Sequence, residues 1–156
     1  MTEIDLFLVQ LAQAYDRKSW HGTNLRGSVR GLTETAAAWR PAPRRHSIQE
    51  IVVHAAYWKY VVRRRLTGDK RGGFPLHGSD WFPRPVADAR QWREDLLLLD
   101  SQHRLLRDTI AGLDPNSLQK PLAGSVTPLY LVSGVIAHDL YHAGQIQLLK
   151  RMAREP

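Results

Sequence analysis

The apolar residues near the N-terminus recur every three or four positions, which is the spacing of an amphipathic α-helix. The members of this stripe are Ile4, Phe7, Leu8, Leu11 and Tyr15. We expect its helix to end near residues 20–22, and a second helical stretch to carry Leu25, Val29 and Leu32. Thr33 then lies where it can cap a short helix that is terminated by Pro41.

Three longer helices are predicted in the rest of the chain. Ser47 and Glu50 have the spacing of a capping box, and the helix that they open runs to about residue 66. The next helix covers about 87–111. The last begins after Thr127, has Pro128 in its first turn and continues to about residue 152.

Two of these helices carry apolar seams that indicate packing against neighbouring helices. In the helix over 87–111 the seam consists of Trp92, Leu96, Leu99, His103, Leu106 and Ile110. In the last helix it consists of Leu131, Val135, His138, His142, Gln145 or Ile146, and Leu149. No strand pattern is found, so we predict an all-α fold, a four-helix bundle that forms a single domain over residues 1–156. Four glycines and three prolines within residues 67–86 predict a long loop between the second and third helices of the bundle, and loops of this length often carry function.

Composition narrows the class of protein further. A chain of 156 residues and 17.8 kDa has room for one domain, and its 43% apolar and 24% charged residues favour a folded globular protein. No apolar run approaches the roughly 20 residues of a membrane span, and the N-terminus is acidic and amphipathic, so we expect a cytoplasmic protein without a membrane segment. The absence of cysteine excludes a disulfide framework, a thiolate zinc site and a cysteine nucleophile. The side chains that remain as candidates for a reactive or metal-binding site are histidines and carboxylates.

The chain is strongly basic, with a net charge of +7 and an isoelectric point near 10.1. Arginine dominates this charge, and a basic run extends from Arg63 through Arg65 to Lys70 and Arg71. Basic proteins attract anions in general. No zinc-finger spacing, recognition-helix signature or aromatic-basic RNA motif accompanies the charge, so we expect a solvated basic surface and no nucleic-acid partner.

Histidines in apolar stripes are the strongest candidates for chemistry. His138 and His142 are four residues apart, so both rings project from one helix face, with β-carbons about 6 Å apart. One metal ion can bind both rings, but a tight site needs a third ligand. His54 is the best candidate, because it lies in the apolar stripe of another helix, where an unpaired imidazole is costly.

The remaining histidines have simpler interpretations. His103 lies in a seam and is interpreted as a core residue, with a role as a fourth ligand as the alternative. His21, His46 and His77 lie in segments rich in helix breakers, where we expect them to be solvated or to make local hydrogen bonds.

The run from His138 to His142 also resembles the HExxH motif of zinc proteases, with Asp139 in place of the glutamate. The shorter side chain would displace the catalytic base, and no third ligand follows at the spacing of the extended motifs. We therefore interpret Asp139 as a carboxylate that supports a ligand or lies on the surface.

Two segments carry a resemblance to a known family: residues 47–54, SIQEIVVH, and residues 138–146, HDLYHAGQI. The tripeptides WHG at 20–22 and WRP at 39–41 support it. With these features the chain resembles the DinB-like family of metal-dependent proteins, which is related to the YfiT-like group. The resemblance implies a four-helix bundle, a homodimer, and a divalent metal ion bound by His54, His138 and His142. Some relatives are transferases or isomerases that use thiols such as bacillithiol or mycothiol, and many have no assigned reaction.

Three neutral imidazoles leave the full charge of a divalent ion uncompensated, and no carboxylate is placed to offset it. An anionic fourth ligand, such as hydroxide, thiolate or carboxylate, is therefore favoured. We expect a zinc or nickel site that activates a low-molecular-weight thiol or water, in a thiol-dependent S-transferase that acts on a small anionic or thiol substrate. Trp58 and Trp81 are candidates to line its pocket beneath the loop over 67–86, and plain core packing is the simpler interpretation of each. The alternatives are a metal-dependent hydrolase, and a non-catalytic binding module with structural histidines and a basic surface. No catalytic side chain is assigned.

Overall fold

The computed structural model describes residues 1–154, which form helices joined by loops, without a β-strand in that part of the chain. The longest helices are α4 (Ile48–Thr67), α5 (Ala89–Ala111) and α6 (Pro128–Met152). Before them come α1 (Glu3–Tyr15) and the short α2 (Leu25–Ser28) and α3 (Glu34–Ala38), and a 3-10 turn, η1 (Pro115–Ser117), lies between α5 and α6. The all-α prediction is confirmed.

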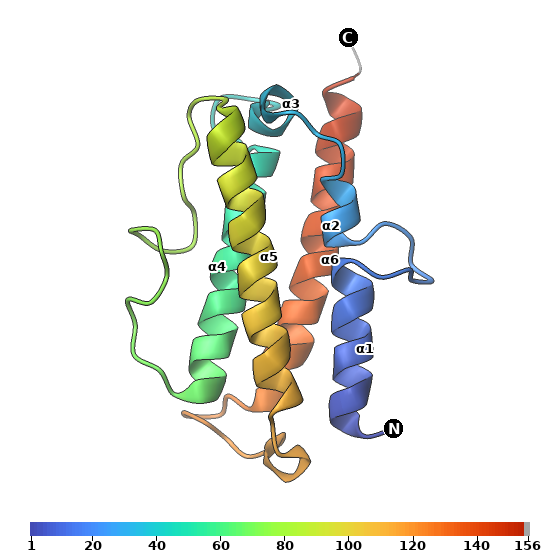
Figure 1. Cartoon of the computed structure of the whole chain (residues 1–156), viewed down its shortest axis with the longest axis vertical. Helices are drawn as coiled ribbons and strands as arrows, with labels where there is room; N and C mark the ends of the chain where they lie inside the picture. Colours follow the sequence, from blue (N-terminus) through green and yellow to red (C-terminus); the bar gives the residue numbers. More distant parts are fainter. Residues whose placement is uncertain (155–156) are drawn as a thin grey trace.

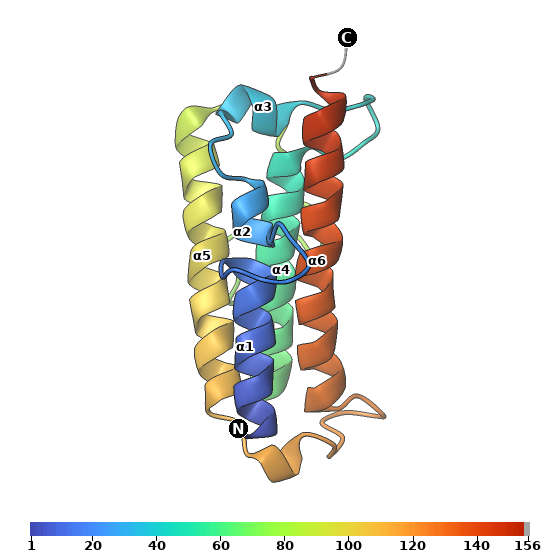
Figure 2. The same cartoon turned by 90° about the vertical axis from the view of Figure 1, so that its right-hand side faces the viewer.

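The three long helices run side by side, and the shorter ones complete the bundle (Figure 1). Figure 2 shows α1 and α2 following one another along a single column between α5 and α6, with α3 across one end. This column therefore consists of two separate helices, as the sequence pattern predicted, although both are shorter than expected. The two ends of the described chain lie at opposite ends of the bundle.

The predicted caps begin the helices as expected. The Ser47 hydroxyl accepts the N–H of Glu50 at 3.2 Å, and the Glu50 carboxylate accepts the N–H of Ser47 at 3.3 Å, which completes a capping box at the start of α4. Thr127 caps α6 by accepting the N–H of Tyr130 at 3.2 Å. Thr33 caps α3 in the same way.

Two predicted helix ends were wrong. Helix α1 ends at Tyr15, before residues 20–22, because its apolar stripe stops there and Trp20 is 100% exposed, so no packing extends the helix. Helix α2 covers one turn only, and Gly31 with a φ of 73° turns the chain before Leu32.

A fully buried ion pair lies among the apolar residues of the core. Lys59 of α4 donates to Asp139 of α6, and both side chains are fully buried. The ring of Tyr15 lies 5.0 Å from the Lys59 ammonium. The prediction that Asp139 supports a ligand or lies on the surface was therefore wrong, because its carboxylate points into the core and joins two helices.

Among residues 1–154, none of the helices combines the length and the apolar character that crossing a membrane requires.

Candidate metal centre

Helices α4 and α6 bring the three predicted histidines together. The Nε2 atom of His138 lies 3.1 Å from Nε2 of His54 and 3.0 Å from Nε2 of His142. His54 and His142 are buried, with 6% and 3% exposed, and His138 is half-buried. Within the described residues, these three form the one group of histidine or carboxylate side chains whose arrangement suits a metal ion.

The hydrogen bonds of the far ring nitrogens fix where the protons lie. Nδ1 of His54 faces the main-chain carbonyl of Asp80 at 2.9 Å, and Nδ1 of His142 faces the side-chain oxygen of Gln145 at 2.7 Å. Both partners accept only, so each Nδ1 carries the proton and each Nε2 presents a lone pair to the centre. His138 can donate from its Nε2 to one of them at most.

This arrangement fits a cation. In a neutral, metal-free site the proton of His138 can satisfy at most one of the lone pairs on His54 and His142, so at least one Nε2 lone pair has no donor in a buried place, which is unfavourable. Two nitrogens that each lie about 2.05 Å from one ion are about 2.9 Å apart at a right angle and about 3.35 Å apart at a tetrahedral angle. The observed separations fall in this range.

The electrostatic surroundings keep the rings neutral and able to coordinate. Burial lowers the pKa of His54, and it lowers the pKa of His142 to about 4 and that of His138, which the neighbouring histidines depress further, to about 3. Protons therefore do not compete for the Nε2 lone pairs near neutral pH.

Asp80, from the loop between α4 and α5, was missed by the sequence analysis. Its carbonyl accepts from Nδ1 of His54, its carboxylate lies 3.2 Å from the same nitrogen, and it accepts the indole N–H of Trp58 at 2.8 Å. It adopts a left-handed φ of 65°, which aspartate tolerates better than most residues. The expectation that no carboxylate offsets the charge was thus wrong in part, because Asp80 does so from behind His54.

Stacked rings hold His54 from the side. Trp81 stacks on His54 with ring centroids 3.9 Å apart, and on its other face His46 stacks at 3.5 Å. His46 in turn bonds through Nδ1 to the Glu50 carboxylate at 3.1 Å, so it is a local hydrogen-bond partner, as predicted. His21 and His77 are exposed.

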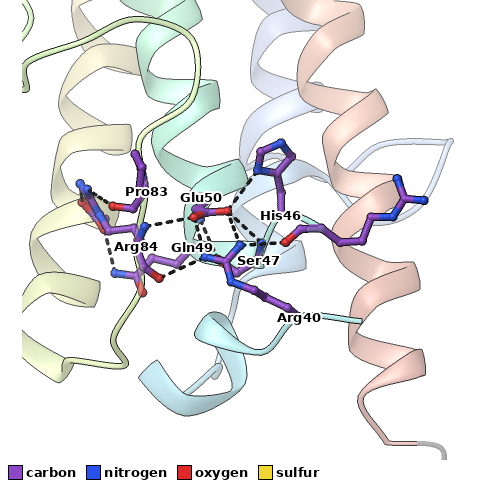
Figure 3. Close-up of polar contacts among 9 residues, drawn as sticks. Arg40, His46, Ser47, Gln49, Glu50, Pro83 and Arg84 are labelled. Atoms are coloured by element: carbon purple, nitrogen blue, oxygen red, sulfur yellow. Dashed lines mark hydrogen bonds and ion pairs between the residues drawn. The ribbon is translucent and has the colours of Figure 1, made fainter. Parts of the chain in front are cut away.

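A network centred on Glu50 anchors this stack (Figure 3). Arg40 donates to both carboxylate oxygens, at 2.6 and 2.7 Å, and the main-chain N–H of Arg84 donates at 3.1 Å. Burial opposes the charge, but the hydrogen bonds from Arg40 and Arg84 hold the pKa of Glu50 at about 2. Glu50, which completes the capping box of α4, therefore also holds the segments that carry His46 and Arg84.

The three histidines lie at the wall of a cleft of about 710 Å³, which we name the metal-site cleft. Of the two candidate tryptophans, Trp81 lines it. Trp58 does not, and its ring lies on another side of His138, with centroids 6.2 Å apart. The rest of the lining is mostly apolar, with Arg45, His46 and Gln145 as its polar members. The apolar residues are Pro41, Ala42, Ile51, Tyr141, Leu148, Leu149 and Met152.

His103 does not join the three-histidine group. It stacks on Tyr15 with centroids 3.6 Å apart, and burial lowers its pKa to about 3. Its interpretation as a core residue agrees with this packing, and the structure does not support the alternative of a fourth ligand.

Comparison with known proteins agrees with the fold and the histidines. A family model described as the DinB superfamily matches residues 18–146, which is most of the chain. No curated protein and no solved structure gave a significant match. The three-histidine group fits a metal-binding protein of that family. On the match over most of its length, the chain belongs to the DinB superfamily.

Proposed function

We propose that this protein is a metal-dependent enzyme that binds one divalent ion, zinc or nickel, through Nε2 of His54, His138 and His142. The observation that carries the proposal is the convergence of these nitrogens, with their protons held on the far side, at the wall of an apolar cleft. A bound divalent ion lowers the pKa of a coordinated thiol or water and so supplies a nucleophile near neutral pH.

The side chains around the histidines orient them and limit access by water. The Asp80 carbonyl and the Gln145 side chain hold the two Nδ1 protons, which aims both Nε2 atoms at the same point. Trp81 covers one face of His54 and separates it from the rim. A reactant in the metal-site cleft therefore meets His138 and His142 from the apolar side.

We propose a thiol as the nucleophile and a small organic electrophile as its partner. The chain contains no cysteine, so the thiol comes from outside, as a low-molecular-weight cofactor. The apolar wall suits the carbon skeleton of the electrophile, and the exposed Arg45 at the rim attracts an anionic group on either reactant. A hydrolase that uses water is the second candidate, since the same three-histidine set supports both.

Metal content tests the site. Untagged purified protein should hold about one divalent ion per chain by elemental mass spectrometry, and His54→Ala, His138→Ala and His142→Ala should each hold less than about a tenth of that. His21→Ala is the matched control, because His21 is exposed and outside the group, and it should keep full occupancy. Full occupancy in His54→Ala would show that the triad is wrong.

Cobalt substitution tests the chemistry. Titrating the cobalt protein with bacillithiol, mycothiol and simple thiols should produce a sulfur-to-metal charge-transfer band, followed by turnover of electrophiles. If no thiol changes the spectrum while a hydrolytic activity appears, the hydrolase replaces the transferase. A protein that never holds metal but binds random DNA in a strongly salt-dependent way would instead be a binding module.

We also propose that the protein is a homodimer joined along α6. One face of this helix carries exposed residues at successive steps of four and three, the pattern of a helix–helix seam. They are Tyr130, Gly134, Ala137, Tyr141, Gly144 and Leu148. A Cβ atom at Gly134 or Gly144 would meet nothing within 4 Å in the single chain, so its own fold does not require glycine there. Light scattering should show a dimer that Leu148→Glu converts to a monomer, and a monomeric wild-type protein at micromolar concentration would contradict this proposal.

The cytoplasmic location expected from the sequence stays a prediction.

A further inference from the structure

A second cleft, of about 630 Å³, lies between the last turns of α4 and the loop that follows it, and we name it the loop cleft. None of the three site histidines lines it. Its walls contain three arginines of the basic run, Arg64, Arg65 and Arg71, together with aromatic rings. We propose that the loop cleft binds a small phosphorylated molecule, with the phosphate on the arginines and the organic part against the rings.

The positive charge in the loop cleft is not balanced by the protein. In the part of the chain that the structure describes, no carboxylate lies within ion-pair distance of Arg64, Arg65 or Arg71. The adjacent Arg63 pairs with the Asp69 carboxylate at 3.6 Å, and Arg64 donates to the Asp69 main-chain carbonyl at 3.3 Å, which leaves its charge unpaired. The one carboxylate that lines the cleft, Asp80, is turned toward Trp58 and His54. Guanidinium groups recognise phosphate through paired hydrogen bonds, and a concave site concentrates their field.

The dipole of helix α4 does not account for the positions of all three arginines. Arg64 and Arg65 occupy the last turn of α4, where cations are favoured by the helix dipole without any ligand. Arg71 lies beyond the left-handed cap Gly68, outside the helix, yet it lines the same cleft. Two segments of the chain therefore contribute like charges to the walls of one concave site, where an anion can interact with both.

The cleft is formed before any ligand arrives. The N–H of Gly73 donates to the Tyr60 hydroxyl at 3.1 Å, which ties the loop to α4. Phe74 packs against Tyr57, Tyr60 and Phe82, with ring centroids 5.3 to 5.5 Å apart. A preformed aromatic wall lowers the entropic cost of binding and favours a ligand that carries a ring or another apolar part beside its phosphate.

Calorimetric titration at low ionic strength tests this site, with phenyl phosphate as the probe and inorganic phosphate as the probe that lacks a ring. We expect one phenyl phosphate per chain, weaker binding of inorganic phosphate, and a loss of about tenfold or more in affinity in Arg64→Gln/Arg71→Gln. The matched control is Arg93→Gln/Arg104→Gln, which removes the same charge from exposed arginines of α5 outside the cleft, and it should bind like the wild type.

The outcomes separate this site from the metal centre. Binding that survives in His54→Ala supports a distinct site, whatever the fate of the proposed enzyme activity. Binding that disappears in His54→Ala but persists in Arg64→Gln/Arg71→Gln would place the ligand at the metal centre and overturn the proposal. So would the absence of saturable binding, or equal weakening in the α5 control, which would reveal a nonspecific charge effect. If phenyl phosphate does not bind but the cleft variant loses retention of random DNA, the arginines belong to a nucleic-acid surface and the proposal fails.

Discussion

Lys59 and Asp139 form an ion pair between α4 and α6, the two helices that carry the three histidines, and neither side chain is exposed at all. The pair is incompletely satisfied, because the second carboxylate oxygen of Asp139 has no hydrogen-bond partner within the described residues. Replacing Asp139 by asparagine keeps the shape but leaves the Lys59 ammonium buried without a countercharge. We expect this change to lower the free energy of unfolding by about 3–5 kcal/mol.

Removing the charge of Lys59 should lower the free energy of unfolding by less than removing the charge of Asp139. Burial raises the pKa of the Asp139 carboxyl while Lys59 opposes it, so in Lys59→Met the carboxyl can take up a proton and avoid an isolated charge. The double variant Lys59→Met/Asp139→Val removes both charges and the unpartnered oxygen together. This variant should regain most of the lost stability, so that its free energy of unfolding lies within about 1 kcal/mol of the wild-type value or above it.

Urea unfolding of the metal-free proteins, followed by helical circular dichroism, measures these differences without a contribution from metal binding at the adjacent His138. Glu94→Gln is the control, because it breaks an exposed pair with Arg90 at 2.8 Å, whose side chains are 79% and 57% exposed, and should leave the unfolding curve unchanged. A loss below about 1 kcal/mol in Asp139→Asn would refute the reasoning, since that is the size expected of a solvated pair.

Three further predictions concern the site and the core. Burial holds the pKa values of His103 and His138 at about 3 and that of His142 at about 4, below 6.5 in the unfolded chain. The unfolded chain therefore binds more protons, and urea denaturation should show the free energy of unfolding of metal-free protein falling from pH 6.5 toward pH 4, less steeply in His103→Phe. Chelation should leave the helical circular dichroism unchanged at room temperature, because a bundle of this size has its own core, and a loss of signal would contradict that. Asp80→Asn should weaken metal binding by about tenfold in chelator competition while Asp69→Asn in the same loop should not, and equal affinities would remove Asp80 from the site.

The helices could be predicted because their signals are local. Ser47 with Glu50, and Thr127 with Pro128, satisfy the first turns of α4 and α6 from within a few residues of sequence. The end of α1 was placed too late, because the apolar stripe stops at Tyr15 and nothing in the fold covers Trp20, so no packing extends the helix to residues 20–22. A pattern shows which residues are apolar, and only tertiary contact decides which of them become buried.

The three histidines were predictable in the same way, because each lies in an apolar stripe of its helix. The contacts that orient them were not, since Asp80 lies 26 residues from His54 in a loop without periodicity. The buried pair did leave a signal in the sequence. Lys59 follows Val52 and Ala55 at steps of three and four, and Asp139 follows Val135 by four, so both charges occupy core positions of their helices.

The loop between α4 and α5 determines the shape of both clefts although it has no regular secondary structure. Near its start it is fixed by the hydrogen bond from Gly73 to Tyr60, in its middle by Asp80 against Trp58 and His54, and near its end by Arg84. Arg84 joins the Glu50 network through its backbone and pairs with the buried Asp95 of α5 at 2.8 and 2.9 Å. Since Trp81 lines the metal-site cleft and Phe74 lines the loop cleft, these anchors set the position of one wall in each. The order of the site therefore depends on a few polar contacts from the loop to α4 and α5 as much as on the packing of the helices that carry the histidines.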